Sequence, residues 1–256
     1  MILETSHLSF QYDSDFAIKD LSFQLNKGDF CALLGPNGSG KTTLLNLLTG
    51  LLKTNEGLIK IDNQDLKNYS AIELARKVAV VPQRQDFVYD FSVYDTVMMG
   101  RNPHQNRWEF SNEKDHQIVM NALEMTKLTH LKNRLTNHLS GGEFQRTLIA
   151  RAIAQQAPIM MLDEPLSNLD IAHKFEIMDI LKNINTTQNT TIILIIHDFS
   201  FAFQYVPLSL LIDKGTLRFF GATNEVFSGT MLYEAFDLNQ GFKIDCYGNV
   251  FKVNSL

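Results

Sequence analysis

The feature that most restricts the fold of this chain is a glycine-rich segment between an apolar run and a helical pattern. Residues 35–42 read G-P-N-G-S-G-K-T and satisfy the pattern G-x-x-x-x-G-K-[ST] at every required position. Its glycines can adopt backbone angles closed to residues with a Cβ, so successive N–H groups can turn inward around an anion. The apolar run Phe30–Leu34 precedes it and the helix-like run Lys41–Leu48 follows it. This order predicts a phosphate-binding loop whose following helix points its N-terminus at the same anion.

Lys41 and Thr42 distinguish this segment from an ordinary tight turn between a strand and a helix. The Lys41 ammonium would reach the β- and γ-phosphates of a nucleotide as a point charge, and the Thr42 hydroxyl would bind Mg²⁺. A turn formed only for steric reasons would need neither side chain. The predicted nucleotide-binding residues of the loop are Gly35, Pro36, Asn37, Gly38, Ser39, Gly40, Lys41, Thr42 and Thr43.

A second feature is a pair of carboxylates at the end of a predicted strand. The apolar run Ile159–Leu162 leads directly into Asp163 and Glu164. Two carboxylates at the end of a buried strand repel each other, which raises the pKa of one of them unless a cation is near. Mg²⁺ would supply that cation. Taken alone, the pair could equally end a strand at the protein surface. Beside a phosphate loop, it indicates a metal-nucleotide site.

Residues 139–145, L-S-G-G-E-F-Q, lie between these two features. The phosphate loop, this signature segment and the acidic strand end together resemble the ATP-binding cassette family, the ATPase subunits of membrane transporters. The resemblance implies ATP and Mg²⁺ as ligands, with Asp163, Thr42 and Gln83 on the metal side. It also implies that Glu164 polarises the attacking water as general base. No required catalytic position is missing, so an active ATPase is expected.

The resemblance implies roles for further residues. Tyr12 stands where the family places an aromatic ring that stacks on adenine. Gln83, in V-A-V-V-P-Q, matches a glutamine that contacts the metal and water and senses the permease. Asp170, in S-N-L-D, matches a loop that crosses a dimer interface. His197, after the apolar run Thr191–Ile196, matches the histidine that holds the γ-phosphate, whereas the other histidines show no metal-ligand spacing.

The signature segment predicts a second anion site. Ser140, Gly141 and Gly142 open a helix whose apolar face consists of Leu148, Ile149, Ala152 and Ile153. In the family, one chain does not fold both anion sites onto one phosphate. The resemblance therefore implies a head-to-tail homodimer, in which Ser140 and Gly142 of one copy close on the γ-phosphate held by Lys41 of the other.

A competing motif precedes the phosphate loop. Asn26–Asp29 read N-K-G-D, which matches a short guanine-specificity pattern of GTPases. In GTPases that motif follows the phosphate loop by a long interval, whereas here it comes first. We therefore interpret it as a hairpin turn containing Gly28.

Composition limits the partners and the compartment. The chain has 256 residues, of which 45% are hydrophobic, and a net charge of −5. This charge provides no basic field for nucleic acid or for an anionic membrane surface. The apolar runs are strand-sized and residues 1–7 lack the layout of a secretion signal, so a cytoplasmic protein is expected. Cys31 and Cys246 are far apart in sequence and are expected to be reduced thiols.

The apolar runs predict an α/β fold. Strands are expected near residues 30–34, 58–61, 78–81, 159–162 and 191–196, in a mainly parallel sheet. The fold class is a P-loop nucleotide hydrolase core with an antiparallel β subdomain and an inserted helical subdomain. The chain is expected to be one ATPase domain over 1–256. Its core, together with the β subdomain, would span 1–87 and 156–256, and the helical signature subdomain would span 88–155. Hairpins are expected at 213–220 and around 248–249. The helix after Asp170 is expected to present one apolar face made of Ile171, Phe175, Met178 and Leu181.

Two stretches, Val93–His104 and Ala122–Leu131, indicate the branch of transporter. They resemble the ATPases that drive uptake of iron-siderophore, haem and cobalamin, a pattern that molybdate importers share. The implied partners are integral membrane permease subunits and, indirectly, a substrate-binding protein, which would place the chain on the cytoplasmic face of the membrane. An exporter subunit, a soluble cassette ATPase acting on ribosomes or DNA, and a non-hydrolysing subunit are the alternatives.

Overall fold

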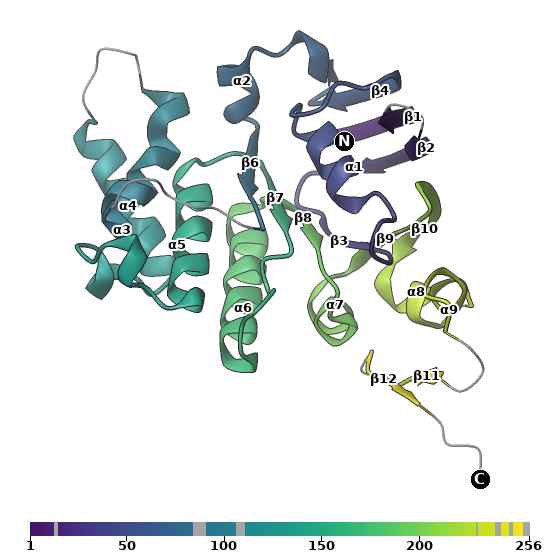
Figure 1. The fold of residues 1–256 in the computed structure, drawn as a ribbon. Helices are drawn as coiled ribbons and strands as arrows, with labels where there is room; N and C mark the ends of the chain where they lie inside the picture. The colour runs from purple at the N-terminus through teal and green to yellow at the C-terminus, as the bar shows by residue number, and fades with distance from the viewer. Residues whose placement is uncertain are drawn as a thin grey trace. The chain divides into compact units, whose positions relative to one another are not determined.

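The structure, a computed structural model, describes residues 1–12, 15–83, 91–105, 111–228, 230–238, 242–245 and 248–252. The chain forms two compact units, whose elements are labelled in Figure 1. The first unit combines Met1–Asn68 with Thr191–Leu256, and the second unit is Tyr69–Thr190. These bounds differ from the subdomain limits expected from the sequence, which stay a prediction. No helix in the described ranges is both long enough and apolar enough to cross a lipid bilayer.

The first unit contains an antiparallel sheet. Its strands run in the order β2 (Asp15–Leu25), β1 (Leu3–Tyr12), β4 (Glu56–Ile61) and β5 (Gln64–Asp65), and the 3₁₀ helix η1 (Leu66–Asn68) follows. Buried and more exposed residues alternate along β1, and its register against β2 shifts between Thr5 and Leu8, between Leu8 and Phe10, and between Phe10 and Gln11. This pattern is that of a sheet with one buried face.

A second sheet of this unit leads into the phosphate loop. Its strands run in the order β10 (Thr216–Ala222), β9 (Leu208–Asp213), β3 (Phe30–Leu34) and β8 (Thr191–Ile195). β3 pairs in parallel with both β8 and β9, whereas β10 returns antiparallel to β9. Every residue of β3 and β8 is buried, as expected for parallel strands covered on both faces.

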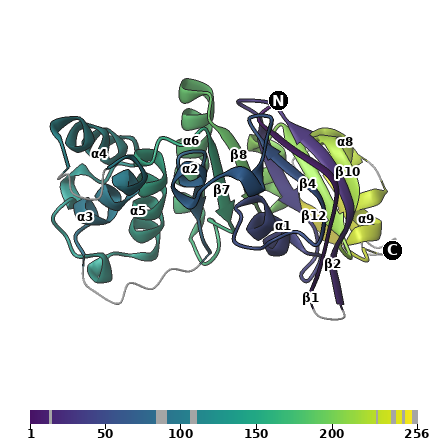
Figure 2. The same cartoon turned by 90° about the horizontal axis from the view of Figure 1, so that it is seen from above.

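Short helices and a hairpin complete the first unit. They are α1 (Lys41–Leu48), α7 (Phe199–Tyr205), α8 (Thr223–Ser228), α9 (Met231–Ala235), β11 (Phe242–Ile244) and β12 (Val250–Lys252). In Figures 1 and 2, α8 and α9 lie beside this sheet, where α8 contacts β9 and β10 and α9 contacts β9. The β9–β10 and β11–β12 pairs confirm the two predicted hairpins.

The second unit pairs β6 (Val78–Val81) in parallel with β7 (Ile159–Asp163). Its helices are α2 (Ala71–Ala75), α3 (Val93–Met98), η2 (Met99–His104), α4 (Glu113–Met125), η3 (Thr129–Leu131), η4 (Thr136–His138), α5 (Gly141–Ala154) and α6 (Ile171–Gln188). α3, α4 and α5 pack against one another (Figures 1 and 2). Parallel strands and helices in both units confirm the predicted α/β class. The strand expected near residues 58–61 in the parallel sheet is wrong in its placement, because it is β4 of the antiparallel sheet.

The turn before β3 differs from its expected form. Within Asn26–Asp29, the amide of Asp29 donates to the carbonyl oxygen of Asn26 at 3.1 Å, and Gly28 has a φ of 85°. The turn is present, but it is not a hairpin, because β2 and β3 belong to different sheets. In β3, Cys31 is a free thiol whose pKa is raised, first by burial and then by the Asp29 carboxylate. Cys246 lies outside the described residues.

The apolar face expected for α6 is wrong over its first turns. Ile171 and Phe175 are 61% and 39% exposed, whereas Met178 and Leu181 are buried. The side chains that α6 buries are Ile177, Met178, Ile180, Leu181 and Ile184. Periodicity shows which side chains share a helix face, but it does not show how much of that face its unit covers.

Candidate nucleotide site

The phosphate loop joins β3 to α1, and its glycines are needed for two different reasons. A Cβ on Gly35 (φ 149°) would stand 2.1 Å from the carbonyl oxygen of Ile212. A Cβ on Gly40 (φ 103°) would stand 2.4 Å from that of Ala17. Gly38 (φ 76°) has no atom within 4 Å of the same position, so only its backbone conformation favours glycine. The loop is therefore held tightly at both ends and is open in the middle.

Lys41 lies inside this loop and is only 6% exposed. Its Nζ donates to the carbonyl oxygens of Gly35 (2.9 Å) and Pro36 (2.8 Å). The N-cap Gly40 has no side-chain cap, and the first turn of α1 contains no acidic residue. Ser39 Oγ is buried and has no hydrogen-bond partner among the described residues. A fixed cation, a helix N-terminus without a competing carboxylate and an unsatisfied hydroxyl fit a polyphosphate.

A cavity of about 230 Å³ borders the loop. Residues 36–39 line one part of it, and Asp213, Lys214 and residues 234–237 line the rest. The carboxylates of Asp213, Glu234 and Asp237 make this wall predominantly negative, which opposes a phosphate there. We therefore expect the phosphates at the start of α1 and not in this cavity.

Tyr12, at the end of β1, supplies an exposed aromatic ring in the first unit. It is 47% exposed, and its ring meets the ring of Phe10 edge to face with the centroids 4.7 Å apart. A ring packed on one neighbour with much of its surface exposed can stack on a base. The adenine-stacking role of Tyr12 stays a prediction.

The acidic strand end lies in the second unit, and the structure brings two of the predicted catalytic residues together there. Asp163 ends β7 and is 8% exposed, and Glu164 follows it with a φ of 48°. The amide Nε2 of Gln83 donates to Glu164 Oε2 at 2.7 Å. This bond orients the Glu164 carboxylate while the Gln83 amide oxygen remains an acceptor. A left-handed backbone at a glutamate is strained, and such strain is concentrated at functional sites.

The signature residues begin α5, but two backbone N–H groups at this helix start already donate to side chains of the same turn. Ser140 is the N-cap, and its Oγ accepts from the Glu143 amide at 3.3 Å. In return, the Ser140 amide donates to Glu143 Oε2 at 2.8 Å. This second bond is the largest cause that holds the pKa of the Glu143 carboxyl below its usual value. A carboxylate thus stands at the helix N-terminus where an external anion would bind.

Asp170 is the N-cap of α6 and is largely exposed. Its Oδ1 accepts from the His173 amide at 2.9 Å and is joined to the His173 ring at 2.7 Å. These bonds hold the pKa of the Asp170 carboxyl below its usual value, the amide bond being the larger cause. The interface role expected for Asp170 stays a prediction.

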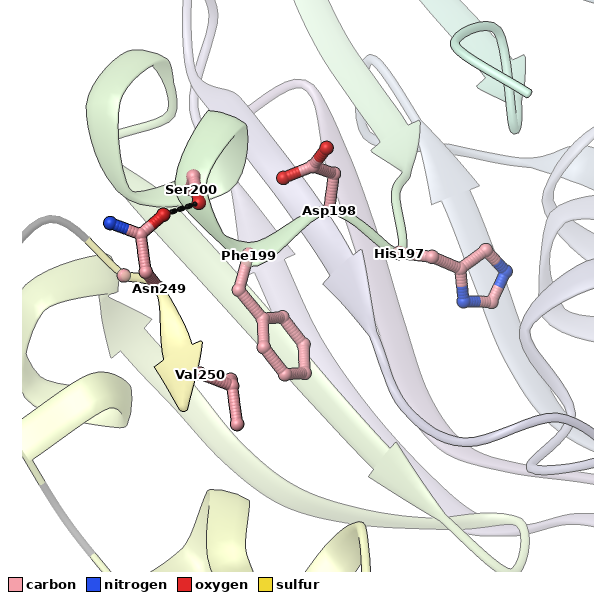
Figure 3. Close-up of a pocket in the computed structure, with 7 residues that line it drawn as sticks. His197, Asp198, Phe199, Ser200, Asn249 and Val250 are labelled. Atoms are coloured by element: carbon pink, nitrogen blue, oxygen red, sulfur yellow. Dashed lines mark hydrogen bonds between the residues drawn. The ribbon is translucent and has the colours of Figure 1, made fainter. Parts of the chain in front are cut away.

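His197 follows β8 and is exposed in the first unit. Figure 3 shows it at one end of a cavity of about 570 Å³, whose other wall comes from the hairpin residues 248–250. Ser200, in α7, donates to Asn249 Oδ1 at 2.6 Å and so ties α7 to the hairpin. The imidazole of His197 points away from this hydrogen-bonded pair (Figure 3). The γ-phosphate role of His197 stays a prediction.

The predicted residues divide between the two units. The first holds Tyr12, the loop with Asn37, Thr42 and Thr43, and His197, and the second holds Gln83, Ser140, Gly141, Gly142, Asp163, Glu164 and Asp170. The donors predicted for Mg²⁺ are a hydroxyl, an amide oxygen and a carboxylate, the oxygen ligands that this ion prefers. In the described ranges, no three His, Cys, Asp or Glu side chains gather into a metal site.

Two residues that shape these sites were missed. Glu143 could have been found, because S-x-x-E before an apolar helix is the pattern of a capping box. His173 carries no local signal for its packing on Gly142, because that contact joins it to another helix.

Comparison with known proteins covers most of the chain. The profile of the ABC transporter family matches residues 18–167. This match includes the phosphate loop, Gln83, the signature and both carboxylates, and it ends before Asp170 and His197. A petrobactin import ATP-binding protein of Bacillus anthracis is 34% identical over 246 residues, which cover 96% of this chain and 89% of that protein.

Solved structures are similar over the same range. A transporter described as being of the metal-chelate type, in an inward-facing conformation, matches with a TM-score of 0.82 and 33% identity over 98% of this chain and 95% of that one. A dimeric ATP-binding cassette in a post-hydrolysis state, bound to ADP and Pi, matches with a TM-score of 0.75 and 27% identity over 87% of this chain and 99% of that one.

Proposed function

This chain belongs to the ABC transporter family and is one of its ATPases, and we propose that it powers the import of a metal chelate through a separate membrane permease. The chelate would be of the iron-siderophore, haem or cobalamin type. The observation that carries this proposal is the similarity, over nearly the whole of both chains, to a petrobactin import protein. The likeness to a structure of metal-chelate type supports the same class of cargo.

Nucleotide binding would begin at the phosphate loop. Lys41 is held by the carbonyl oxygens of its own loop, so its charge is in place before the nucleotide arrives. The β- and γ-phosphates would take the N–H groups at the start of α1 and the Lys41 ammonium. Tyr12 would stack on the adenine ring.

Hydrolysis would depend on Glu164. A general base must be oriented toward the water it polarises, and the 2.7 Å hydrogen bond from Gln83 supplies that orientation. Thr42, Gln83 and Asp163 would hold Mg²⁺, whose charge would offset that of the phosphates. His197 would hold the γ-phosphate. Because Gln83 is bonded directly to the base, a displacement of the Gln83 segment would move the Glu164 carboxylate.

The working form would be a homodimer that shares its nucleotides. The start of α5 already carries the Glu143 carboxylate, so it is a poor anion site by itself. The negative charge of a γ-phosphate bound to Lys41 and Mg²⁺ of a second copy would already be offset by these cations. The Glu143 carboxylate would therefore repel it less. ATP would then favour the closed dimer because its contacts are shared between the copies. The similar cassette solved as a dimer with ADP and Pi supports this arrangement.

The second unit offers a surface for the permease. A cavity of about 380 Å³ is lined by residues of β6, η2 and α5, among them Val78, Val80, Met99, Pro103 and Arg151. Its apolar wall and single guanidinium suit a short protein segment better than a transported metal. Docking there would hold the chain on the cytoplasmic face of the membrane, with a substrate-binding protein acting from the other side. The net charge of −5 argues against a nucleic-acid partner.

The test is ATP hydrolysis by the chain reconstituted with the permease encoded beside it. Candidate metal chelates and their binding protein are added in turn, and the wild type is compared with Glu164→Gln. Loss of the general base should lower the rate by about 10²-fold or more while nucleotide binding is retained.

Stimulation of the wild type by one chelate would identify the cargo. Normal hydrolysis by Glu164→Gln would show that the general base is wrong. Failure of any permease to associate would contradict the transporter assignment, and stimulation by a cytoplasmic compound alone would indicate export.

A further inference from the structure

His173, in the first turn of α6, is fastened to Asp170 by two hydrogen bonds. Its backbone amide donates to Asp170 Oδ1 at 2.9 Å, and its ring Nδ1 lies 2.7 Å from the same oxygen. A carboxylate can only accept hydrogen bonds, and these bonds favour the ionised form of Asp170. Nδ1 therefore carries a hydrogen, and the orientation of the imidazole is fixed.

The opposite edge of the ring rests on the signature helix. A Cβ on Gly142 would stand 2.0 Å from Cδ2 of His173 and 2.7 Å from both Cγ and Nε2. Gly142 does not have a positive φ, so its backbone conformation does not require glycine. Glycine is required at this position because the imidazole ring of His173 lies too close for a Cβ. By contrast, a Cβ on Gly141 would meet only a Leu169 methyl group at 3.8 Å.

A second contact, one turn further along both helices, keeps α5 and α6 in this register. Arg146, 8% exposed in α5, donates to Glu176 Oε2 of α6 at 2.5 Å. Arg146 lies one turn after Gly142, and Glu176 lies one turn after His173. The two helices are thus joined over their first two turns by the packing of His173 on Gly142 and by an ion pair one turn later.

We propose that His173 is a positioning residue that holds the N-terminus of α5 in place against the Asp170 loop, so that the signature residues are ready to receive the γ-phosphate of a second copy. This inference rests on the shared-nucleotide dimer of the proposed function. His173 need not touch the nucleotide itself. Through Nδ1 it fixes Asp170, and through its Cδ2–Nε2 edge it fixes Gly142, so the predicted interface loop and the signature move together.

The test measures ATP-dependent dimerisation of the full chain in a Glu164→Gln background, in which bound ATP should persist because the proposed general base is removed. His173→Ala removes the ring contact to Asp170 and the packing on Gly142. His173→Asn keeps a donor near the place of Nδ1 and removes only the edge that packs on Gly142. Loss of a hydrogen bond to a charged group should raise the protein concentration for half-dimerisation by about tenfold in His173→Ala. Affinity for a fluorescent ATP analogue, measured below the dimerisation range, should stay unchanged, because the phosphate loop belongs to the other unit.

Gly142→Ala provides a coupled test of the contact itself. Its new Cβ would collide with the ring, so this variant alone should dimerise more weakly than His173→Ala. Combining Gly142→Ala with His173→Ala removes the collision, so the double variant should dimerise more strongly than Gly142→Ala alone.

The outcomes separate this inference from the function on which it rests. Unchanged dimerisation in His173→Ala, or no recovery in the double variant, would overturn the role of His173. If the Glu164→Gln reference itself forms no dimer with Mg-ATP, the proposed function fails and this inference fails with it. A drop in monomer ATP affinity equal to the drop in dimerisation would show a general structural effect and would also overturn the role.

Discussion

The helices α1 and α5 both begin at glycine-containing segments, and both are expected to face a phosphate. At α1, the N-cap Gly40 has no side chain, the first turn has no carboxylate, and Lys41 adds a positive charge. At α5, Ser140 caps the helix and Glu143 places a carboxylate beside it. One helix start is thus built to attract an anion, whereas the other is already satisfied by its own residues.

This difference indicates how two anion sites can act in sequence. The site at α1 should bind nucleotide in a single chain. The site at α5 should contribute only when the γ-phosphate is presented together with the cations of a second copy. An arrangement of this kind would make closure depend on ATP, because a nucleotide without a γ-phosphate would lack the group that the start of α5 is expected to contact.

The largest effect should come from removing the cation at α1. Lys41→Ala deletes a charge-assisted contact to the phosphates worth about 3 kcal/mol, so the Kd for ATP should rise about 100-fold. Isothermal titration of the isolated chain measures this change, with Lys53→Ala as a control that removes an exposed lysine outside the loop. An ATP affinity for Lys41→Ala within a few fold of the control would contradict the contrast between the two helix starts.

The next effect concerns the glycines that shape the α1 site. Gly35→Ala would drive a Cβ into the backbone of β9, 2.1 Å from the Ile212 oxygen, and should destabilise the fold by about 3 kcal/mol. Gly38→Ala meets open space and has only the cost of a left-handed backbone, about 1 kcal/mol. Urea unfolding without nucleotide measures both, and equal losses would show that the close approach at Gly35 is not what requires glycine.

The sequence predicted the strand that leads into the phosphate loop and the strand that leads to Gln83. β3 and β6 have the expected bounds, since a buried parallel strand is a continuous apolar run that can be recognised locally. The loop and the helix α1 followed from glycine, lysine and threonine at fixed spacing. These features depend on neighbouring residues in the chain, which is why a single sequence shows them.

Other features depend on contacts that no local pattern records. The exposure of Ile171 and Phe175 depends on how far the unit covers α6. The packing of His173 on Gly142 joins two helices that are distant in sequence. The Glu143 cap is a different case, because its spacing from Ser140 was visible and only its competition with an anion needed the structure.

A smaller effect should come from the cap of α5. Ser140→Ala removes the oxygen that accepts from the Glu143 amide, which should lower the free energy of unfolding by about 1 kcal/mol. Ser70→Ala deletes the same kind of cap on α2, which buries none of its residues, and should have less effect because that helix can fray locally. Circular dichroism during urea unfolding compares the two. Equal losses of unfolding free energy would mean that burial of α5 does not increase the stability that its cap contributes.

The smallest effect is a pH dependence at the start of α5. The pKa of Glu143 is lower in the folded chain than its usual value of 4.5, so its ionised form stabilises the fold. This contribution is fully present above about pH 4.5, and it is lost as the pH falls through the folded pKa. Glu143→Gln keeps an acceptor but not the charge, and it should be less stable than wild type at pH 7 by about 0.5 kcal/mol, a gap that narrows in acid. Glu124→Gln, in the last turn of α4, removes the same net charge from an exposed site far from a helix N-terminus. If Glu143→Gln and Glu124→Gln show the same change with pH, the carboxylate at α5 is not held by its helix, and the contrast between the two helix starts would rest on Lys41 alone.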